Sequence, residues 1–317
     1  MKLVLAAARD GEAYYHLLDG ITGLEMARAT TPADVLEQVR DADVLYGFPA
    51  PEIIAAAPRL RWIQLPSAGA EFVPRLPELV ASDIVVTTTR GAHAPSVAEH
   101  VFALLLALTR CLPACLDWQR QKHWGNSEGY GMPREIAGST LGIVGFGQLG
   151  RAVAKRARAF DLHVLALDSQ TGDGKQEADA IWPPSRLPEL LARSNIVVVT
   201  VPYTPETHHW IDARALETMR SGACLVVVSR GGVVDEDALV ASLRSGRLAG
   251  AALDVAEREP LPPESPLWEL PNVILTPHVA GSSAAKERRC VEILRDNLIR
   301  YQNREPLLNV IDKTRGY

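Results

Sequence analysis

The sequence predicts an α/β protein with two doubly wound parallel β-sheets. Three observations predict this class. Short apolar stretches alternate with helical stretches along the chain, a glycine-rich turn joins a strand to a helix in mid-chain, and about 140 residues of the same alternating pattern precede that turn. The length of 317 residues favours two domains, and an apolar fraction of 47% suffices for two packed cores.

The first part of the chain contains four predicted strands with helices between them. The strands are Lys2–Ala7, Val44–Tyr46, Trp62–Leu65 and Ile84–Thr87. One helix begins at Thr31, where the threonine would cap the end, Pro32 would take the first helical position and Asp34 would suit the first turn. Because short apolar strands alternating with helices indicate βαβ units, this part is predicted to form a parallel sheet of its own.

A long apolar helix leads into the second part. Ser96 and Glu99 have the spacing of a capping box, and the apolar pattern continues over Val97–Thr109. The helical pattern resumes over Leu112–Trp124, and the segment 125–131, rich in Gly, Asn and Ser, is predicted to be a loop.

The glycine-rich turn reads Gly145-Phe146-Gly147-Gln148-Leu149-Gly150. Gly145 permits a tight turn, Gly147 lets the backbone approach a pyrophosphate, and Gly150 lets the helix pack on the strand. The helix N-terminus then offers unpaired N–H groups and a positive dipole end to the phosphates. These glycines alone would also suit an ordinary βα turn, so their context decides the interpretation.

That context is typical of a dinucleotide-binding site. The turn follows the apolar strand Leu141–Val144, and a helical pattern continues to about Phe160. A second strand, His163–Leu167, ends at Asp168, whose carboxylate can accept hydrogen bonds from the adenine ribose. Strand, glycines, helix, strand and acid in this order predict a bound dinucleotide.

Four further strands complete the second sheet. They are Ile196–Val199, Cys224–Val228, Gly250–Asp254 and Val273–Leu275, which with the first two make the six strands of a Rossmann sheet. A last helix, about Ala284–Asn303, and the tail Leu307–Ile311 follow this sheet, and both are expected to return to the first domain. The dinucleotide domain, residues 99–285, is therefore predicted to be inserted into a domain of residues 1–98 and 286–317, with a cleft and two hinges between them.

Three polar side chains follow the last three strands. Arg230 has a fixed fork of donors that can bind a carboxylate and polarise a carbonyl. His278 can act as general acid or base near neutral pH, and Glu259 can orient its imidazole. Taken singly, they could be an ion-paired arginine, a loop charge and a surface histidine. Together beside a dinucleotide fold, they predict hydride transfer to a 2-oxo acid and its reverse.

Composition and patterning exclude several other classes. A net charge of −5 and a pI near 5.9 disfavour a nucleic-acid partner. The four cysteines lack paired CxxC spacing and no histidine completes a metal set, so we expect reduced thiols, no metal site and a cytoplasmic protein. The apolar run Leu3–Ala8 is too short for a secretory signal and Val101–Leu108 is too short to span a bilayer, so no membrane segment is expected.

Along nearly its full length, the chain resembles the D-isomer-specific 2-hydroxyacid dehydrogenase family. The Arg-Gly, Glu-Pro and Pro-His-x-Ala-Gly blocks are especially specific to this family among Rossmann enzymes. The resemblance implies an NAD-dependent enzyme similar to glyoxylate/hydroxypyruvate reductases, with a Rossmann domain inserted into a smaller flavodoxin-like substrate domain and the active site in the cleft. The matching segments are Ser67–Phe72, Ser96–Leu108, Gly138–Arg151, Pro202–His209, Ser229–Leu239, Gly250–Pro262 and Thr276–Ser283.

The resemblance also implies roles for individual residues. Arg230, Glu259 and His278 hold the family's catalytic positions, and Asp254 resembles the acid that contacts the nicotinamide carboxamide. Backbone amides at Ser67, Ala68 and Gly69 would hold the substrate carboxylate together with Arg230 and His278. Without the resemblance, that segment would be interpreted as an ordinary strand-end turn. Further expected cofactor contacts are Val201, Pro202, Thr207, Ser229, His278 and Gly281.

Two positions depart from the family pattern, and one acid indicates the cofactor. Val227 stands where the family usually has Asn, and Ala256 stands where it often has an aromatic residue. Neither change removes a catalytic group. Asp168 should repel the 2′-phosphate of NADP, and Ser169-Gln170 offers no arginine to compensate, so NAD is the expected cofactor.

The substrate and the assembly are less constrained. Glyoxylate, hydroxypyruvate or pyruvate suits the family, and Tyr46, Leu65, Trp124 and Met132 are candidates to line the side-chain pocket. His123 and Trp124 precede a loop that crosses a dimer in some family members, although simple helix packing would also explain them. A homodimer is expected, although the apolar helix from Val97 could equally be a buried crossover.

Two other functions fit the same scaffold. Formate dehydrogenases replace the acid partner of the histidine by a glutamine, whereas this chain has Glu259 and places Thr276-Pro277 before His278. The remaining alternative is an NAD(H)-sensing binding protein, similar to the corepressors that share this fold, without significant turnover.

Overall fold

The computed structural model describes residues 1–6, 11–125, 133–169 and 176–317. The chain forms two compact units, which we call unit 1 (Met1–His93 and Ser282–Tyr317) and unit 2 (Ala94–Gly281). In sequence, unit 2 is therefore inserted between the two segments of unit 1. The expected divisions after residues 98 and 285 fall instead inside helices α5 (Ala94–Thr109) and α11 (Ala284–Gln302).

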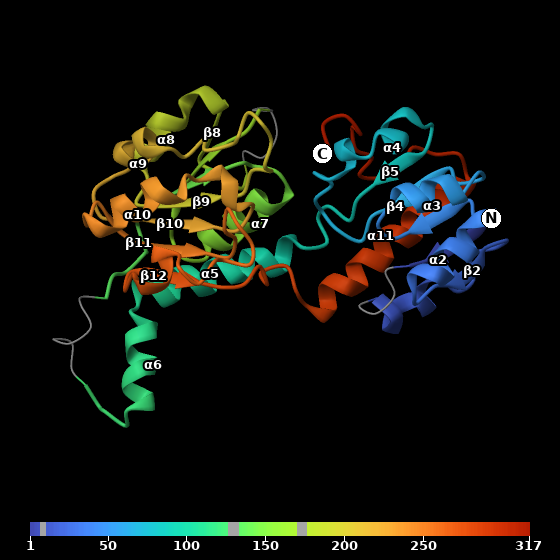
Figure 1. The fold of residues 1–317 in the computed structure, drawn as a ribbon. Coiled ribbons are helices and arrows are strands. Elements are labelled where there is room, and N and C mark those ends of the chain that lie inside the picture. The colour runs from blue at the N-terminus through green and yellow to red at the C-terminus, as the bar shows by residue number, and fades with distance from the viewer. Residues whose placement is uncertain (7–10, 126–132, 170–175) are drawn as a thin grey trace. The chain divides into compact units, whose positions relative to one another are not determined.

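Unit 1 contains a five-stranded parallel sheet in the order β2-β1-β3-β4-β5, which is the flavodoxin-like order (Figure 1). The strands are β1 Lys2–Leu5, β2 Glu25–Arg28, β3 Val44–Tyr46, β4 Trp62–Gln64 and β5 Val85–Thr87. Alternate residues of each strand enter two cores: Leu3 and Leu5 pack beside α11, whereas Val4 packs on the other face. The other helices are η1 Glu12–Leu18, α2 Pro32–Gln38, η2 Val39–Asp41, α3 Pro51–Ala56, η3 Val73–Arg75 and α4 Pro77–Ala81.

The start of α2 forms as the sequence predicts. The backbone N–H of Asp34 donates to the Thr31 hydroxyl over 3.1 Å, and the N–H of Thr31 donates to the Asp34 carboxylate over 3.0 Å. These two bonds satisfy donors that the first helical turn leaves unpaired. Hydrogen bonds from the Thr30 backbone and from Thr31 hold the pKa of Asp34 below its ordinary value.

Unit 2 contains a seven-stranded parallel sheet in the order β12-β11-β10-β9-β6-β7-β8. The six strands from β8 to β11 follow the Rossmann order, and β12 extends it. The strands are β6 Thr140–Val144, β7 His163–Leu167, β8 Ala180–Trp182, β9 Ile196–Val199, β10 Ala223–Val227, β11 Leu248–Leu253 and β12 Val273–Leu275. The predicted fold class, two doubly wound parallel sheets, is confirmed.

Helices cover both faces of the unit 2 sheet (Figure 1). Ile143 of β6 packs with residues of α5 and α7, whereas the next residue, Val144, packs with residues of α8, α9 and α10. The helices are α6 Leu112–Arg120, α7 Gln148–Arg158, η5 Pro184–Arg186, α8 Leu187–Arg193, α9 Ala213–Thr218, η6 Gly231–Val233, α10 Glu236–Arg244 and η7 Pro266–Glu269, besides α5. The strand order reverses between β6 and β9, so the carboxyl ends of these two strands mark the usual ligand position of such a sheet.

Two expectations about α5 and α6 are wrong. Helix α5 begins at Ala94, so Ser96 lies inside the first turn and does not cap it; Pro95 suits that turn because it needs no N–H partner there. Helix α6 ends at Arg120, and Trp124 lies beyond it with a side chain 99% exposed. Within the described residues, no single helix is long and apolar enough to cross a membrane, although the pair α5 and α6, bent by 71°, meets the length and composition test together.

Candidate active site

The glycine turn after β6 has the close contacts that exclude larger residues. Gly145 has a φ of +104°, and a Cβ there would lie 2.7 Å from Cγ1 of Val201. A Cβ on Gly150 would collide with the carbonyl of Gly145. Gly147 is exposed, with nothing within 4 Å of its Cβ position, so the space beside its backbone is open to a ligand. Phe146 is instead buried, with the Arg151 guanidinium 5.0 Å from its ring centre.

The first turn of α7 is built to receive an anion. The helix begins at Gln148, and its N-cap, Gly147, contributes no side-chain hydrogen bond. Its first N–H groups, including those of Gln148 and the half-buried Leu149, therefore lack helical partners and are available to an anion such as a phosphate.

The neighbouring strand ends also suit a dinucleotide. Asp168 follows β7, beside β6, and its N–H donates to the carbonyl of Trp182 over 2.9 Å. Ser229 follows β10; it is 7% exposed, and its hydroxyl has no hydrogen-bond partner among the described residues. A buried hydroxyl costs free energy unless it is paired, which favours a polar ligand group at Ser229. The residues present therefore fit a dinucleotide.

The segment after β9 forms a turn across the point where the strand order reverses. Val201 packs against Gly145, as the contact with a Cβ at Gly145 indicates. The Thr207 hydroxyl donates to the carbonyl of Pro202 over 2.8 Å and accepts from the N–H of Thr204 over 2.8 Å. These bonds fix the turn that carries the expected cofactor contacts Val201, Pro202 and Thr207.

Asp254, at the end of β11, organises the turn after β12. Its carboxylate is 1% exposed and accepts from the Thr276 hydroxyl over 2.6 Å, the N–H of Val279 over 3.0 Å and the N–H of Ala280 over 2.9 Å. The N–H of His278 donates to the Asp254 carbonyl over 2.8 Å. The acid expected to contact the nicotinamide thus also fixes the backbone of the segment that carries His278 and ends at the half-buried Gly281.

His278 and Glu259 form a close pair. Nδ1 of His278 lies 2.7 Å from Oε2 of Glu259, and Oε1 of the same carboxylate accepts from the N–H of Ala256 over 3.1 Å. Nε2 of His278 has no hydrogen bond within the described residues, and the side chain is 46% exposed. The φ of His278 is +54°, a left-handed backbone that histidine adopts more readily than most residues. One ring nitrogen is therefore held by a carboxylate while the other faces outward.

Arg230 follows β10 and precedes η6, next to the Glu259 segment. Its Nη1 donates to the Ser229 carbonyl over 2.8 Å, which holds the guanidinium close to its own strand end. A Cβ on the next residue, Gly231, would collide with the main chain of Ala256. The backbones that carry Arg230 and Glu259 are thus in direct contact, and only glycine permits this approach.

Both departures from the family pattern fit the packing. Val227 is 1% exposed in the core between β10 and the helices α8 to α10, where an apolar residue needs no hydrogen-bond partner. Ala256 lies where its main chain meets Gly231.

The expected substrate turn lies in unit 1. Ser67 to Gly69 follow β4, and the Ser67 hydroxyl donates to the Gly69 carbonyl over 2.7 Å. In the part of the chain that the structure describes, the N–H groups of Ala68 and Gly69 donate no hydrogen bond, which leaves them available to an anion.

The four residues expected to line the pocket for the substrate's side chain have different outcomes. Tyr46 and Leu65 are 1% and 0% exposed in the two cores of unit 1, so the expectation that they line a pocket is wrong. Trp124 is too exposed to pack on its own chain, and Met132 lies outside the described residues, as does Gln170.

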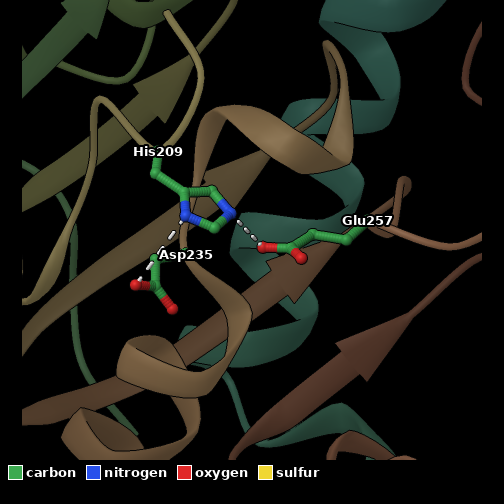
Figure 2. A group of neighbouring side chains, drawn as sticks. All are labelled: His209, Asp235 and Glu257. Carbon is green, nitrogen blue, oxygen red and sulfur yellow. Dashed lines mark hydrogen bonds and ion pairs between the residues drawn. The ribbon is translucent and has the colours of Figure 1, made fainter.

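Sequence reasoning missed two histidines. His100 of α5 lies 2.9 Å from the Thr276 hydroxyl and 3.5 Å from the carboxylate of Asp254. His209 lies between Asp235 and Glu257, a group whose ligand atoms fall within 4.8 Å of one another (Figure 2). The only signal for His209 was the segment Pro202–His209, which resembles the family but gave this residue no role.

The cysteines are free thiols, as expected. Cys224 and Cys290 are buried, and burial raises the pKa of both thiols, which makes them poor nucleophiles. Cys111 and Cys115 are partly exposed.

A Rossmann sheet with an open glycine turn and an Arg, a Glu and a His at its strand ends defines a dinucleotide-dependent oxidoreductase. The sequence profile of the "D-isomer specific 2-hydroxyacid dehydrogenase, NAD binding domain" matches residues 102–280. The chain belongs to the D-isomer-specific 2-hydroxyacid dehydrogenase family and is an oxidoreductase.

Relatives and solved structures agree with this assignment. A glyoxylate reductase from Korarchaeum cryptofilum is 36% identical over 290 residues, which cover 88% of this chain and 85% of the relative. A family protein from Aeromonas salmonicida is 32% identical with a TM-score of 0.85, covering 98% of this chain and 99% of that one. A family dehydrogenase from Xanthobacter autotrophicus, solved with NADPH and MES, is 32% identical with a TM-score of 0.83, covering 100% and 99%. These similarities support reduction of a 2-oxo acid.

Proposed function

We propose that this enzyme reduces a small 2-oxo acid of the glyoxylate or hydroxypyruvate type to the 2-hydroxy acid, reversibly and with NADH, and forms the D isomer where C2 of the product is chiral. The observation that carries the proposal is the His278–Glu259 pair at 2.7 Å, in which the second ring nitrogen of His278 has no hydrogen bond within the described residues. His278 follows β12, Glu259 follows the neighbouring strand β11, and Arg230 follows β10, the next strand in the sheet. Bound NADH would supply the hydride to C2 of the substrate.

The chain's own residues supply the binding and the proton. Nδ1–H of His278 donates to the Glu259 carboxylate, which orients the ring. Nε2–H can then donate a proton to the carbonyl oxygen during reduction and recover it during oxidation. Arg230 binds the substrate carboxylate and polarises the carbonyl, and the amides of the Ser67–Gly69 turn contribute further donors, a role that rests on the family resemblance.

A steady-state screen tests this function. Purified protein is assayed with glyoxylate, hydroxypyruvate and pyruvate against NADH and NADPH, and we expect NADH oxidation with at least one of them. Binding of NADH without oxidation across the panel would favour the NAD(H)-sensing alternative, which the same fold supports.

Asp168 should set the preference for NAD. Its position after β7, where the adenine ribose of a bound dinucleotide lies in this fold, places a negative charge where NADP carries its 2′-phosphate. Asp168→Ala should weaken NADH binding by about tenfold or more, because hydrogen bonds to a carboxylate are lost, and should narrow the gap to NADPH. Asp168→Glu is the matched control. Fluorescence titration with both dinucleotides measures the ratio, and an unchanged ratio in Asp168→Ala would refute the role of this acid.

We further propose a homodimer formed through the region of α6. Its apolar side chains Leu112 and Leu116 are 46% and 49% exposed, and Trp124 just beyond it is 99% exposed. A monomer would leave these three large apolar side chains in water, which is unfavourable. Leu116→Glu should shift the sedimentation coefficient from dimer to monomer, with exposed Val279→Glu as control. A wild-type monomer would contradict this assembly.

A further inference from the structure

A second imidazole–carboxylate contact lies beside the His278–Glu259 pair, on the same segment of chain. We call residues 255–260 the acidic loop; it follows β11 and carries both Glu257 and Glu259. Glu259 holds His278, whereas Oε1 of Glu257 lies 2.8 Å from Nε2 of His209. Any movement of this loop would alter both contacts.

The acidic loop is clamped to the start of α10. The N–H of Glu236 donates to Oε1 of Glu257 over 3.0 Å, and the N–H of Glu257 donates to Oε1 of Glu236 over 2.5 Å. The two residues therefore exchange hydrogen bonds in the manner of a capping box, but between segments distant in sequence. The clamp brings two carboxylates together, and their repulsion opposes it.

His209 contacts the Glu257 carboxylate of this clamp and lies beside a second carboxylate, that of Asp235. Figure 2 shows its ring between two carboxylates, with Nε2 toward Glu257 and Nδ1 toward Asp235, the N-cap of α10. The second distance, Nδ1 to Oδ2 of Asp235, is 4.0 Å. The N–H of His209 also donates to the Gly232 carbonyl over 2.9 Å, which ties the histidine to the segment after Arg230. One residue thus joins the turn after β9, the start of α10 and the acidic loop.

A metal ion explains this geometry less well than a hydrogen bond does. Each ring nitrogen faces a different carboxylate, at 2.8 and 4.0 Å, which is the arrangement of two separate side-chain contacts rather than of three ligands directed at one ion. The contact of 2.8 Å is the length of an N–H···O bond to a carboxylate and leaves no space for an ion between the two atoms.

We propose that His209 is a positioning residue that holds the acidic loop, so that Glu259 stays within hydrogen-bond distance of His278 and Gly231 stays packed on Ala256 behind Arg230. This inference rests on the proposed function for its effect on turnover. Its effect on the loop itself does not depend on that function.

The test compares three variants with the wild type. His209→Gln keeps an N–H donor near the position of Nε2, His209→Ala removes the donor, and His163→Gln changes an exposed histidine at the other end of β7. We measure kcat and KM with a 2-oxo acid, the Kd of NADH, the melting temperature, and hydrogen exchange of peptides that cover residues 255–260.

We expect kcat/KM of His209→Ala to fall by about tenfold, because small displacements of catalytic groups are costly, while the NADH Kd changes less than about twofold. His209→Gln should recover most of the loss, and His163→Gln should match the wild type. Exchange at residues 255–260 should accelerate in His209→Ala alone, since the N–H groups of Ala256 and Glu257 are hydrogen-bonded only while the loop is held.

Three results would overturn the proposal. The first is unchanged exchange of the acidic loop in His209→Ala, and the second is a kcat loss that follows only the fraction of folded protein. The third is a loss reproduced in the wild type by EDTA and reversed by Zn²⁺ or Mn²⁺, which would assign the cluster to a cation. If the wild type turns over no 2-oxo acid, the proposed function fails, but the exchange experiment still decides the role of His209.

Discussion

Two histidines of unit 2 have nearly the same local geometry and different surroundings. His278 and His209 both have left-handed backbones, with φ of 54° and 48°, and each ring contacts a glutamate of the acidic loop, at 2.7 and 2.8 Å. In the His278 pair, the second ring nitrogen has no hydrogen bond within the described residues. In the His209 pair, the second nitrogen faces Asp235, and the glutamate also accepts from the N–H of Glu236.

This difference separates a pair suited to proton transfer from a pair suited to support. Proton transfer needs a nitrogen that can reach a ligand, and only His278 has one outside its own network. Both ring nitrogens of His209 face carboxylates of neighbouring segments, those of Glu257 and Asp235. The ring can therefore stabilise the acidic loop but offers no nitrogen to a substrate. The distance between histidine and glutamate does not distinguish the two pairs. The surroundings of the second ring nitrogen distinguish them.

The largest effect should come from replacing His278, whose second ring nitrogen has no hydrogen bond within the described residues. His278→Gln removes the proposed proton donor, and kcat should fall by roughly 10²–10⁴-fold, as for other general acids. The NADH Kd should stay nearly unchanged, because the glycine turn and Asp168 lie on other strand ends. Stopped-flow NADH oxidation and fluorescence titration measure the two quantities, with His209→Gln as the matched variant. Retained turnover in His278→Gln would contradict the assignment of this histidine as acid and base.

Replacing Glu259, the partner of His278, should lower kcat more than replacing Glu257, the partner of His209. Both effects should be smaller than that of His278→Gln. Glu259→Gln removes the carboxylate that holds Nδ1 of His278 and orients its ring, so kcat should fall by about tenfold to a hundredfold. Glu257→Gln keeps an acceptor oxygen for His209 and for the N–H of Glu236, so its kcat should stay close to that of the wild type. Steady-state kinetics of the two variants measure the difference. Equal losses of kcat in both variants would show that the two pairs are not distinct.

The sequence was sufficient to predict the buried parts of the fold. Central strands such as β6 and β9 are covered on both faces, so they appear as continuous apolar runs. The two missed strands, β2 and β8, lie at sheet edges; β2 reads Glu-Met-Ala-Arg and is largely exposed. An edge strand is fixed by pairing with its neighbour, which a single stretch of sequence does not reveal.

The residues of the candidate site also fall into a group that the sequence predicts and a group that it does not. Arg230, Glu259 and His278 could be predicted because they lie in the connections that follow three successive strands, and parallel strands end at one edge of the sheet. His209, Asp235 and Glu257 come from three different connections, and their meeting depends on how those connections fold over the strand ends. Tyr46 and Leu65 failed as pocket candidates because strand alternation directs them into the cores. No local pattern in the sequence encodes these arrangements.

The smallest effect should come from replacing Glu236, which exchanges hydrogen bonds with Glu257, the glutamate that contacts His209. Burial raises the pKa of Glu236 above its ordinary value of 4.5, and the carboxylates of Glu257, Asp237 and Glu259 raise it further. A carboxyl with a raised pKa in the folded state destabilises the fold when ionised; this contribution is absent below the ordinary pKa, grows as the pH rises from the ordinary to the raised value, and is fully present above it. Glu236→Gln keeps an acceptor oxygen for the N–H of Glu257 and loses the charge. Its melting temperature should therefore exceed that of the wild type at pH 7 by a few degrees, and the difference should vanish below about pH 4. Differential scanning fluorimetry from pH 4 to pH 8 measures this, with the exposed Glu52→Gln as control. A lower melting temperature for Glu236→Gln at pH 7 would contradict this prediction, because it would mean that the ionised Glu236 carboxylate stabilises the fold.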